Sequence, residues 1–191
     1  LNVAPDELAS ILRRYPASVQ QAAAGLLKKL GVDPEAQRLK LEELAPLLEG
    51  GDANAGRAVF LSKKANCAAC HRAEGVSPTA GRAGPDLSKI GLSRSSRDLL
   101  EAIVFPSASF VNGYRPHIVA TNSGKTVTGV ISSETTDTIT LKLQDLTEVK
   151  IARRDIDEMK EGSTSIMPKG LDTQLTPEEL RNLLAYLRAR R

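Results

Sequence analysis

Five consecutive residues, Cys-Ala-Ala-Cys-His at positions 67–71, constrain this chain more than any other feature. The sequence holds only two cysteines and two histidines, so three of its four soft metal-ligating side chains fall within this run. In a helix the two thiols would lie about one turn apart, because a turn takes about 3.6 residues. The imidazole of His71 follows the second thiol directly. The run therefore predicts one site at which both thiols and the imidazole act together.

The spacing C-x-x-C-H is that of c-type haem attachment. Two thiols about one turn apart can both reach the vinyl groups of one porphyrin and form thioethers. The adjacent histidine then lies below the iron. We therefore predict one covalently attached haem c, held by Cys67 and Cys70 and bound at the iron by His71 as proximal ligand.

Three other uses of these residues stay open. A redox dithiol is expected after a strand in a βαβ unit, whereas the residues before Cys67 have a helical pattern. A zinc site would need the distant His117 as a fourth ligand, and adjacent Cys70 and His71 are poorly placed to share one tetrahedral ion. A disulfide between the two cysteines is compatible with the spacing but explains nothing else in the sequence.

The composition leaves room for an apolar group that is not protein. Hydrophobic residues make up 41% of the 191 positions and charged residues 26%, as in globular proteins, but aromatic residues only 3%. The net charge of +3 is too mild to argue for nucleic acid. No apolar run approaches the roughly 18 to 20 residues that a membrane helix needs. Because the chain begins at Leu1, we expect a processed chain or an excised piece of a longer protein, so the lack of an export signal is uninformative.

Helical patterns flank the centre of the chain on both sides. Apolar residues recur at spacings of three and four over residues 1–51, which predicts a helical segment there. Residues 52–112 and 162–191 together have the size of a compact all-α domain. A helix is expected to begin at Asp52, another to run from about Ser95 to Val104, and a last one to begin at the capping box Thr176-Pro177-Glu178-Glu179.

The periodicity changes to two between these helical parts. Residues 113–161 alternate apolar and polar side chains, with turns at Asn122 to Gly124 and at Glu134 to Asp137. This predicts four or five strands, enough for a small half-open barrel that resembles an Sm-like or SH3-like fold. Strands between two helical halves indicate an inserted module rather than a mixed sheet. The expected fold class is therefore α+β overall: a mainly α domain, an inserted small β-barrel and an N-terminal helical segment.

The likeness of the chain to class I cytochromes c extends beyond the haem motif. The segment Gly56 to Phe60 resembles the N-terminal helix of that family, whose glycine and aromatic residue cross the C-terminal helix, here Leu183 to Leu187. The segment Gly84 to Leu87 resembles the family's G-P-x-L loop. The resemblance implies that the carbonyl of Pro85 accepts the second N–H of the His71 imidazole, which fixes the ring and raises its basicity as a ligand.

A closer resemblance is to haem-binding domains at the C-termini of large exported proteins of planctomycetes, verrucomicrobia and related bacteria. The similarity covers roughly residues 50–190. In those proteins the domain often follows a β-propeller of the quinoprotein sugar-dehydrogenase type and helical repeats, which implies that residues 1–51 are the tail of such repeats. The matching segments are Gly51 to Phe60, Cys67 to His71, Gly84 to Leu87 and Ser165 to Pro168.

The second axial ligand of the iron is expected to be Met167. It precedes the last helix, as the distal methionine does in the family, and Pro168 stiffens its loop. Three alternatives stay open: Met159 at the end of the β segment, His117 on the first expected strand, and an open site. A histidine and a methionine together would fill both axial positions and raise the reduction potential.

The sequence indicates less clearly what the expected β insertion does and which further side chains contact the haem. Sm folds elsewhere bind RNA, but here the basic residues are interleaved with acidic ones, so we favour a structural cover or docking surface for the haem. Tyr114 either lines the haem pocket or packs beside it. A haem propionate could pair with any of three basic residues: Arg57, Arg82 and Lys169.

The resemblance implies a mono-haem electron-transfer domain rather than an enzyme. By analogy it takes single electrons from a quinoprotein-type dehydrogenase, in the same polypeptide, and passes them to another cytochrome or a membrane chain. Because thioether attachment occurs in exported space, we expect a periplasmic or cell-envelope protein. Two other functions stay open: a haem peroxidase or gas sensor with a labile sixth ligand, and a non-haem interaction module that works through the β segment.

Overall fold

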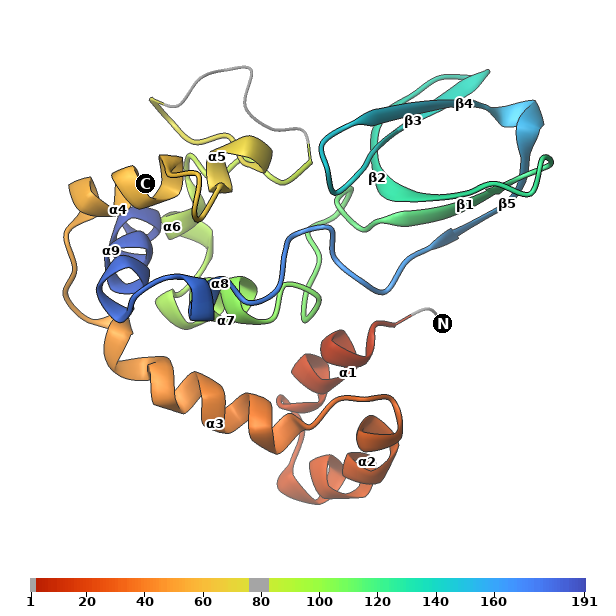
Figure 1. The fold of residues 1–191 in the computed structure, drawn as a ribbon. Helices are drawn as coiled ribbons and strands as arrows, with labels where there is room; N and C mark the ends of the chain where they lie inside the picture. The colour runs from red at the N-terminus through yellow and green to blue at the C-terminus, as the bar shows by residue number, and fades with distance from the viewer. Residues whose placement is uncertain (1–2, 76–82) are drawn as a thin grey trace.

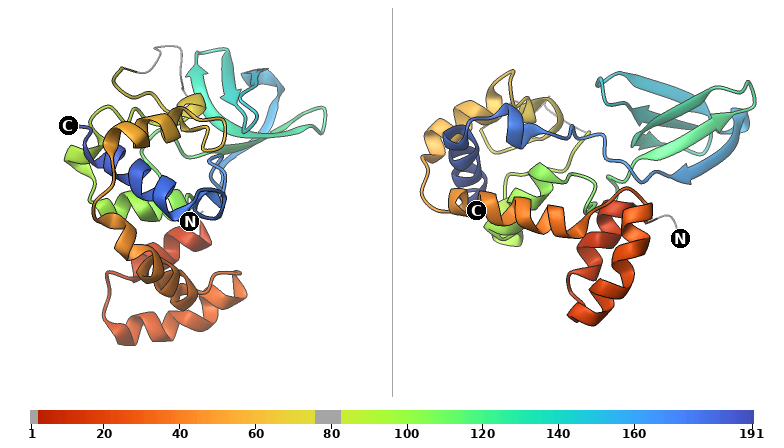
Figure 2. Two further views of the ribbon diagram at one scale, coloured as in Figure 1. Left: turned by 60° about the vertical axis from the view of Figure 1, so that its left-hand side comes forward. Right: turned by 60° about the horizontal axis from the view of Figure 1, so that its bottom comes forward.

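The protein has a helical end and a β end joined by two connecting segments (Figure 1). The computed structural model describes residues 3–75 and 83–191. Arg82, one of the expected propionate partners, lies outside these residues. In both views of Figure 2 the sheet stands beside the helices, and the first three helices lie on the side of the helical end away from α5. The chain is thus α+β, as its periodicity predicts.

The N-terminal segment is helical, as expected. Local signals set its boundaries: Asp33 accepts hydrogen bonds from the amides of Glu35 and Ala36 at the start of α3, and Gly31 has a φ of +78°. A turn of 3₁₀ helix containing Pro46 follows α3 directly. The elements are α1 (Pro5–Leu12), α2 (Ala17–Lys29), α3 (Pro34–Leu44) and η1 (Ala45–Leu48).

The apolar stripes that the sequence predicts for α1 and α2 are only partly buried. Leu27 is fully buried and packs with Ala9 and Val32 in a small cluster. Several other apolar residues of the expected stripes are exposed: Ile11, Tyr15, Val19, Leu26 and Leu30. The helix α1 ends at Leu12, and Pro16 disfavours helical backbone at Tyr15, so α1 and α2 stay separate helices.

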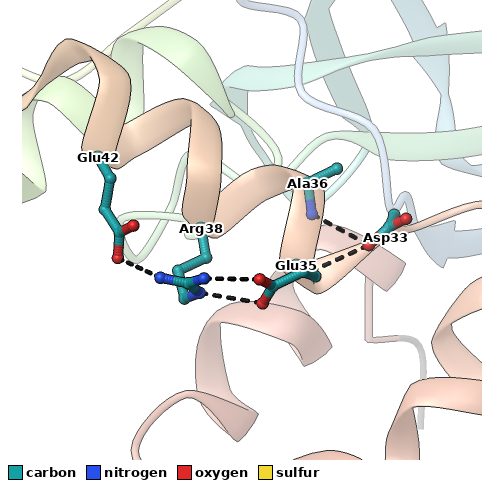
Figure 3. Close-up of polar contacts among 5 residues, drawn as sticks. All are labelled: Asp33, Glu35, Ala36, Arg38 and Glu42. Atoms are coloured by element: carbon teal, nitrogen blue, oxygen red, sulfur yellow. Dashed lines mark hydrogen bonds and ion pairs between the residues drawn. The ribbon is translucent and has the colours of Figure 1, made fainter.

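The outer face of α3 is held by ion pairs within the helix (Figure 3). The Arg38 guanidinium pairs with Glu35 one turn earlier and with Glu42 one turn later. Pairs of this kind stabilise an exposed helix by about 0.3–0.5 kcal/mol each. They leave the opposite face of α3 free to pack against the rest of the protein.

Six helices enclose the main core. Three of them begin at the capping residues that the sequence indicates, Asp52, Ser95 and Thr176. The core extends into the N-terminal segment, because Leu41 and Leu47 are buried in the same cluster as the residues of α7 and α9. The helices are α4 (Ala53–Leu61), α5 (Cys67–Cys70), α6 (Ile90–Ser93), α7 (Ser96–Val104), α8 (Leu171–Gln174) and α9 (Pro177–Arg188).

The helices α4 and α9 cross at a glycine. A Cβ atom on Gly56 would lie 1.9 Å from the carbonyl oxygen of Asn182, so only glycine allows the two backbones to approach this closely. One turn later, the rings of Phe60 and Tyr186 meet with their centroids 5.3 Å apart. The expected crossing of a glycine and an aromatic residue with the last helix is therefore present.

The β segment forms one five-stranded antiparallel sheet in the order β4-β3-β2-β1-β5. The sheet is open, with β4 and β5 at its edges, so the strand pairings do not close the barrel that the sequence suggests. The strand β2 is bent, so that β3 and β4 lie over β1 and β5 (Figure 1). Its pairing with β3 has a register shift between Ile131 and Ser133. The strands are β1 (His117–Thr121), β2 (Thr126–Glu134), β3 (Thr138–Lys142), β4 (Glu148–Ala152) and β5 (Ile156–Glu161), with η2 (Arg153–Asp155) before β5.

The sheet has its own core and a narrow connection to the helices. Its inner face buries a small cluster separate from the helical core: Val119, Val127, Ile139, Leu141 and Ile151. The amide of Gly162 donates to the carbonyl of Pro116 across 2.7 Å. The chain therefore enters and leaves the sheet at one point.

Candidate haem site

The two cysteines lie on one short helix. Asn66, with a left-handed φ of 50°, precedes α5, and the amide of His71 donates to the carbonyl of Cys67 across 2.9 Å. The helix is a single turn with one cysteine at its first residue and the other at its last. Both thiols are free and partly buried, so the structure contains no disulfide between them.

Burial keeps both cysteines in the thiol form. It raises the pKa of Cys67 to about 11, with a smaller contribution from the nearby Cys70. The Cys67 sulfur lies 3.7 Å from the carbonyl of Ala65, which it can reach as a donor. Burial also raises the pKa of Cys70, although Lys142 of β3 opposes the shift. Neither side chain is therefore a reactive thiolate at neutral pH, since only a lowered pKa would make it one.

The His71 imidazole is held in one orientation by the loop that follows it. Its Nδ1 atom lies 2.9 Å from the carbonyl oxygen of Pro85. A carbonyl can only accept, so Nδ1 carries the proton and Nε2 keeps its lone pair. A Cβ atom on Gly84 would lie 2.4 Å from Cε1 of the ring, so this glycine lets the loop backbone lie against the imidazole.

Burial lowers the pKa of His71, and the Pro85 hydrogen bond only partly offsets this. The imidazole is therefore neutral at neutral pH, which is the form that binds a metal ion. Its free nitrogen, Nε2, is the one that the Pro85 carbonyl does not engage. The ring thus has the protonation state and tautomer that an axial ligand requires.

Met167 lies in a loop between β5 and α8 that two serines anchor. The amide of Met167 donates to the hydroxyl of Ser165, and the amide of Ser165 donates to the hydroxyl of Ser107. Ser107 is 3% exposed. Met167 packs against the main core with its side chain partly buried.

One cavity collects all five residues expected to hold the haem: Cys67, Cys70, His71, Pro85 and Met167. Its empty space is about 1370 Å³, including the part that opens to solvent. Apolar side chains form much of its wall: Phe60, Leu87, Ile90, Leu99, Ile103, Leu171, Leu183 and Leu187. A mainly apolar cavity with two thiols, a neutral imidazole and a thioether fits a haem with two axial ligands.

The other candidate ligands lie away from this cavity. Met159 is on β5, opposite Val119, and is 39% exposed. His117 begins β1 and pairs with Gly129. Neither residue lines the cavity. Within the described parts of the chain, no group of three or more His, Cys, Asp or Glu side chains is arranged to hold a metal ion, so the zinc site is not assembled there.

Of the remaining residues expected to contact the haem, one lines the cavity and two do not. Tyr114 lines the cavity. Arg57 instead donates to the carbonyl of Gly75 across 3.0 Å, and Lys169 pairs with Asp6. Neither basic residue is part of the cavity wall.

The cavity also contains residues that sequence reasoning missed. Ser10 and Arg14 reach it from the N-terminal segment, and Phe110 reaches it from the loop before the sheet. Phe110 lies four positions before Tyr114 in a chain with few aromatic residues, and this proximity is the sequence signal that could have indicated its place in the cavity. Nothing in the pattern of residues 1–51 indicates a contact with this cavity.

Comparison with known proteins agrees with this geometry. None of the curated proteins matches the chain. A family model described as cytochrome c matches residues 53–190, from the first residue of α4 to just beyond the end of α9. The matched range includes both cysteines, His71 and Met167. The chain therefore belongs to the cytochrome c family, whose members bind haem c covalently and transfer electrons.

Proposed function

We propose that the chain is a mono-haem electron-transfer domain with histidine and methionine as its axial ligands. In this proposal Cys67 and Cys70 form the thioethers, His71 is the proximal ligand and Met167 the distal one. The observation that carries the proposal is the single cavity that these four side chains share. When bound, the haem supplies a one-electron iron couple whose potential histidine and methionine ligation raises.

The protein's own residues would prepare this site in three ways. The Pro85 carbonyl holds the His71 ring with Nε2 free, as described above. The loop bonds of Ser165 hold Met167 against the core. The apolar wall excludes water, which strengthens every electrostatic interaction inside the cavity. No side chain has to act as a general acid or base, so the domain itself would carry electrons rather than catalyse a reaction.

We also propose a division of the chain into three parts. Residues 52–112 and 162–191 would form the haem domain, residues 113–161 an inserted module of the Sm-like or SH3-like type, and residues 1–51 the tail of a helical region. The separate core of the sheet and its single point of attachment support this division. The module would then act as a cover or as a docking surface for a redox partner.

The donor and acceptor are proposed by analogy. We propose a quinoprotein-type dehydrogenase as the electron donor and another cytochrome or a membrane chain as the acceptor. Location in the periplasm or cell envelope is proposed because covalent attachment of haem c occurs in exported space. Across residues 3–75 and 83–191, none of the helices combines the length and the apolar character needed to cross a bilayer.

Absorption spectra of the matured wild-type chain and of Met167→Ala test this function. The wild type should show the sharp α-band of low-spin ferrous haem c and the weak far-red band of thioether ligation to ferric iron. Met167→Ala should lose the far-red band, while Met159→Ala, a matched change at an exposed methionine, should keep it.

Two results would contradict the proposal. A wild-type spectrum that is high-spin and binds CO readily would favour the peroxidase or gas-sensor function instead. A colourless chain, from cells proven to mature other c-type cytochromes, would leave only the interaction module.

A further inference from the structure

Two buried polar side chains converge on the loop that carries Met167. We call residues 162–170 the methionine loop. Measured over the whole residue, Gln37 and Ser107 are the polar residues that are buried in the described part of the chain, at 7% and 3% exposure. Buried polar groups are usually satisfied by hydrogen bonds. The bonds of both residues lead to the methionine loop.

The Gln37 connection runs through α1. Its Nε2 atom donates to Oδ1 of Asp6 across 2.9 Å, and Oδ2 of Asp6 pairs with Lys169 of the methionine loop at 3.1 Å. On its other side, the Oε1 atom of Gln37 accepts from Arg13 at 3.4 Å. Arg13 in turn pairs with Glu101, which lines the cavity. One side chain of α3 thus links two segments that border the site.

A second side chain of α3 contacts the chain just after the methionine loop. Lys40 pairs at 3.6 Å with Asp172 in α8, whose side chain is only 7% exposed. Gly170, with a φ of +85°, lies between Lys169 and Asp172. The N-terminal segment therefore contacts the chain on both sides of the sharp turn that ends the methionine loop.

The helix α1 also contacts a residue that packs on the cavity wall. Both carboxylate oxygens of Glu7 lie 2.7 Å from one guanidinium nitrogen of Arg115. The same guanidinium lies 4.3 Å above the ring of Phe110, which lines the cavity, and 3.3 Å from Glu161 at the end of β5. The Glu7–Arg115 pair is mostly buried, in contrast to an ordinary surface ion pair.

Serine bonds hold the start of the methionine loop from within the main core. The buried Ser107 accepts from the amide of Ser165, whose hydroxyl accepts from the amide of Met167. The loop is thus fixed near Met167 by Ser107 and near Lys169 by Asp6. A sulfur held in this way would bind an iron without the loop having to be ordered first, which would lower the entropic cost of the bond.

We infer that the N-terminal segment is part of the electron-transfer site, with Gln37 as a positioning residue for Met167. The segment lies before the range that matches the cytochrome c family, so the family itself does not supply this contact. The inference rests on the proposed role of Met167 as distal ligand. Gln37 would act through Asp6 and Lys169, since its own side chain does not line the cavity.

Titration of the ferric chain with imidazole tests the inference, because imidazole competes with Met167 for the iron. Gln37→Met keeps the length of the side chain and removes its hydrogen bonds, and Lys169→Met removes the ion pair with Asp6 at a side chain that is 62% exposed. Both variants should bind imidazole about fivefold more tightly, because a larger fraction of molecules has the methionine displaced.

Arg38→Met is the matched control on the same helix. It removes two ion pairs, but both of them stay within α3 (Figure 3). Its imidazole affinity should equal that of the wild type. The double variant Asp6→Lys with Lys169→Asp restores opposite charges but removes the carboxylate that accepts from Gln37, so its affinity should return only part of the way to the wild-type value, whereas Asp6→Lys alone should show no return.

Amide hydrogen exchange of the matured, haem-loaded chain separates this inference from the proposed function. Residues 162–170 should exchange faster in Gln37→Met than in Arg38→Met, even if the wild type were to lack the far-red band of methionine ligation. Equal exchange in the two variants would overturn the inference. So would a Gln37→Met variant with a lower melting temperature and an unchanged imidazole affinity, since that is what a purely structural residue would give.

Discussion

The Nδ1 atom of His71 donates to the carbonyl of Pro85 across 2.9 Å, although 14 positions separate the two residues. The bond closes the loop that follows α5 and places Gly84 against the imidazole ring. It fixes the tautomer of the ring through a backbone group, which no side-chain substitution at position 85 removes. The orientation of the imidazole therefore depends on the path of the loop backbone, and Gly84 is where that path is most constrained.

Gly84→Ala should disrupt the site while sparing most of the fold. The new methyl group would lie 2.4 Å from Cε1 of His71, so either the ring or the loop must move and the bond to Pro85 is lost. Loss of a group that orients a metal ligand typically costs about 10–100-fold in metal affinity or activity. We expect the yield of haem-loaded chain, measured by the pyridine haemochrome absorbance per protein, to fall about tenfold or more.

The control for this change is Gly25→Ala, in the middle of α2. Nothing lies within 4 Å of the added Cβ atom there. Alanine is the better helix former by about 1 kcal/mol, so this variant should load haem normally and unfold at a slightly higher temperature. Normal haem loading by Gly84→Ala would show that the imidazole does not need the observed loop path.

Gly56→Ala should separate α4 from α9. The Cβ atom would lie 1.9 Å from a carbonyl oxygen of α9 and 2.7 Å from Cβ of Tyr186, and neither atom can move without moving the helix. Overpacking of this kind costs about 1–3 kcal/mol or more of the free energy of unfolding. Urea titration of the variant measures the loss. An unchanged midpoint would mean that the two helices do not cross as closely as described.

Tyr186→Phe should leave the fold as stable as before or more so. The Tyr186 hydroxyl is buried, and none of the described residues supplies it with a hydrogen-bond partner. Removing an unsatisfied buried hydroxyl returns part of its desolvation cost, which is about 1–3 kcal/mol. Thermal melting of the two proteins measures the difference.

Phe60→Ala is the informative comparison for this aromatic pair. It removes the ring that lies 5.3 Å from Tyr186, and truncations of buried Phe cost about 3–5 kcal/mol. A large destabilisation in Tyr186→Phe, approaching that of Phe60→Ala, would show that the hydroxyl has a partner, such as an ordered water.

The pH dependence of stability should contain a contribution from Glu179. The Lys64 ammonium, and next the amide of Thr176, lower the pKa of this carboxyl below its ordinary value of 4.5. A carboxylate with a lowered folded-state pKa stabilises the fold fully above the unfolded value and loses that effect as the pH falls through the folded value. The difference in melting temperature between the wild type and Glu179→Gln should therefore be full at neutral pH and shrink below about pH 4.5.

Glu178→Gln provides the control for charge at the same helix end. It removes a carboxylate from the first turn of α9 without removing the Lys64 contact. Its effect on the melting temperature should be the smaller of the two at neutral pH. A Glu179→Gln difference that stays constant from neutral pH down to acid would refute the assigned shift.

Local rules explain why so much of the helical fold was predictable. The capping residues Asp33, Asp52 and Thr176 act on amides two or three positions away, so the sequence alone contains the whole interaction. The turns at Asn122 to Gly124 and at Glu134 to Asp137 are equally local, and they separate β1, β2 and β3 as expected. Where a residue's hydrogen-bond partner lies only a few positions away, the sequence pattern was sufficient to predict the local structure.

Interactions between distant segments decide which side chains are buried and which residues meet, and the sequence pattern does not show these. Gln37 belongs to a polar stretch of α3, yet it is buried and bonded to Asp6 of α1 and to Arg13 just after α1. Leu26 and Leu27 both belong to an expected apolar stripe, yet only Leu27 of the two is buried. The choice between such neighbours depends on how the helices cross. The placement of Met167 in the same cavity as His71 was available only through resemblance to a family, since the two residues are 96 positions apart in the sequence.

The meeting of Pro116 and Gly162 at the base of the sheet has an evolutionary consequence. A segment that leaves and rejoins the chain at one point can lengthen, shrink or be exchanged without displacing what lies on either side of it. Selection can therefore act on the sheet and on the redox centre separately. Descendants of one ancestral carrier could diversify in what they recognise while the iron environment they inherit stays the same.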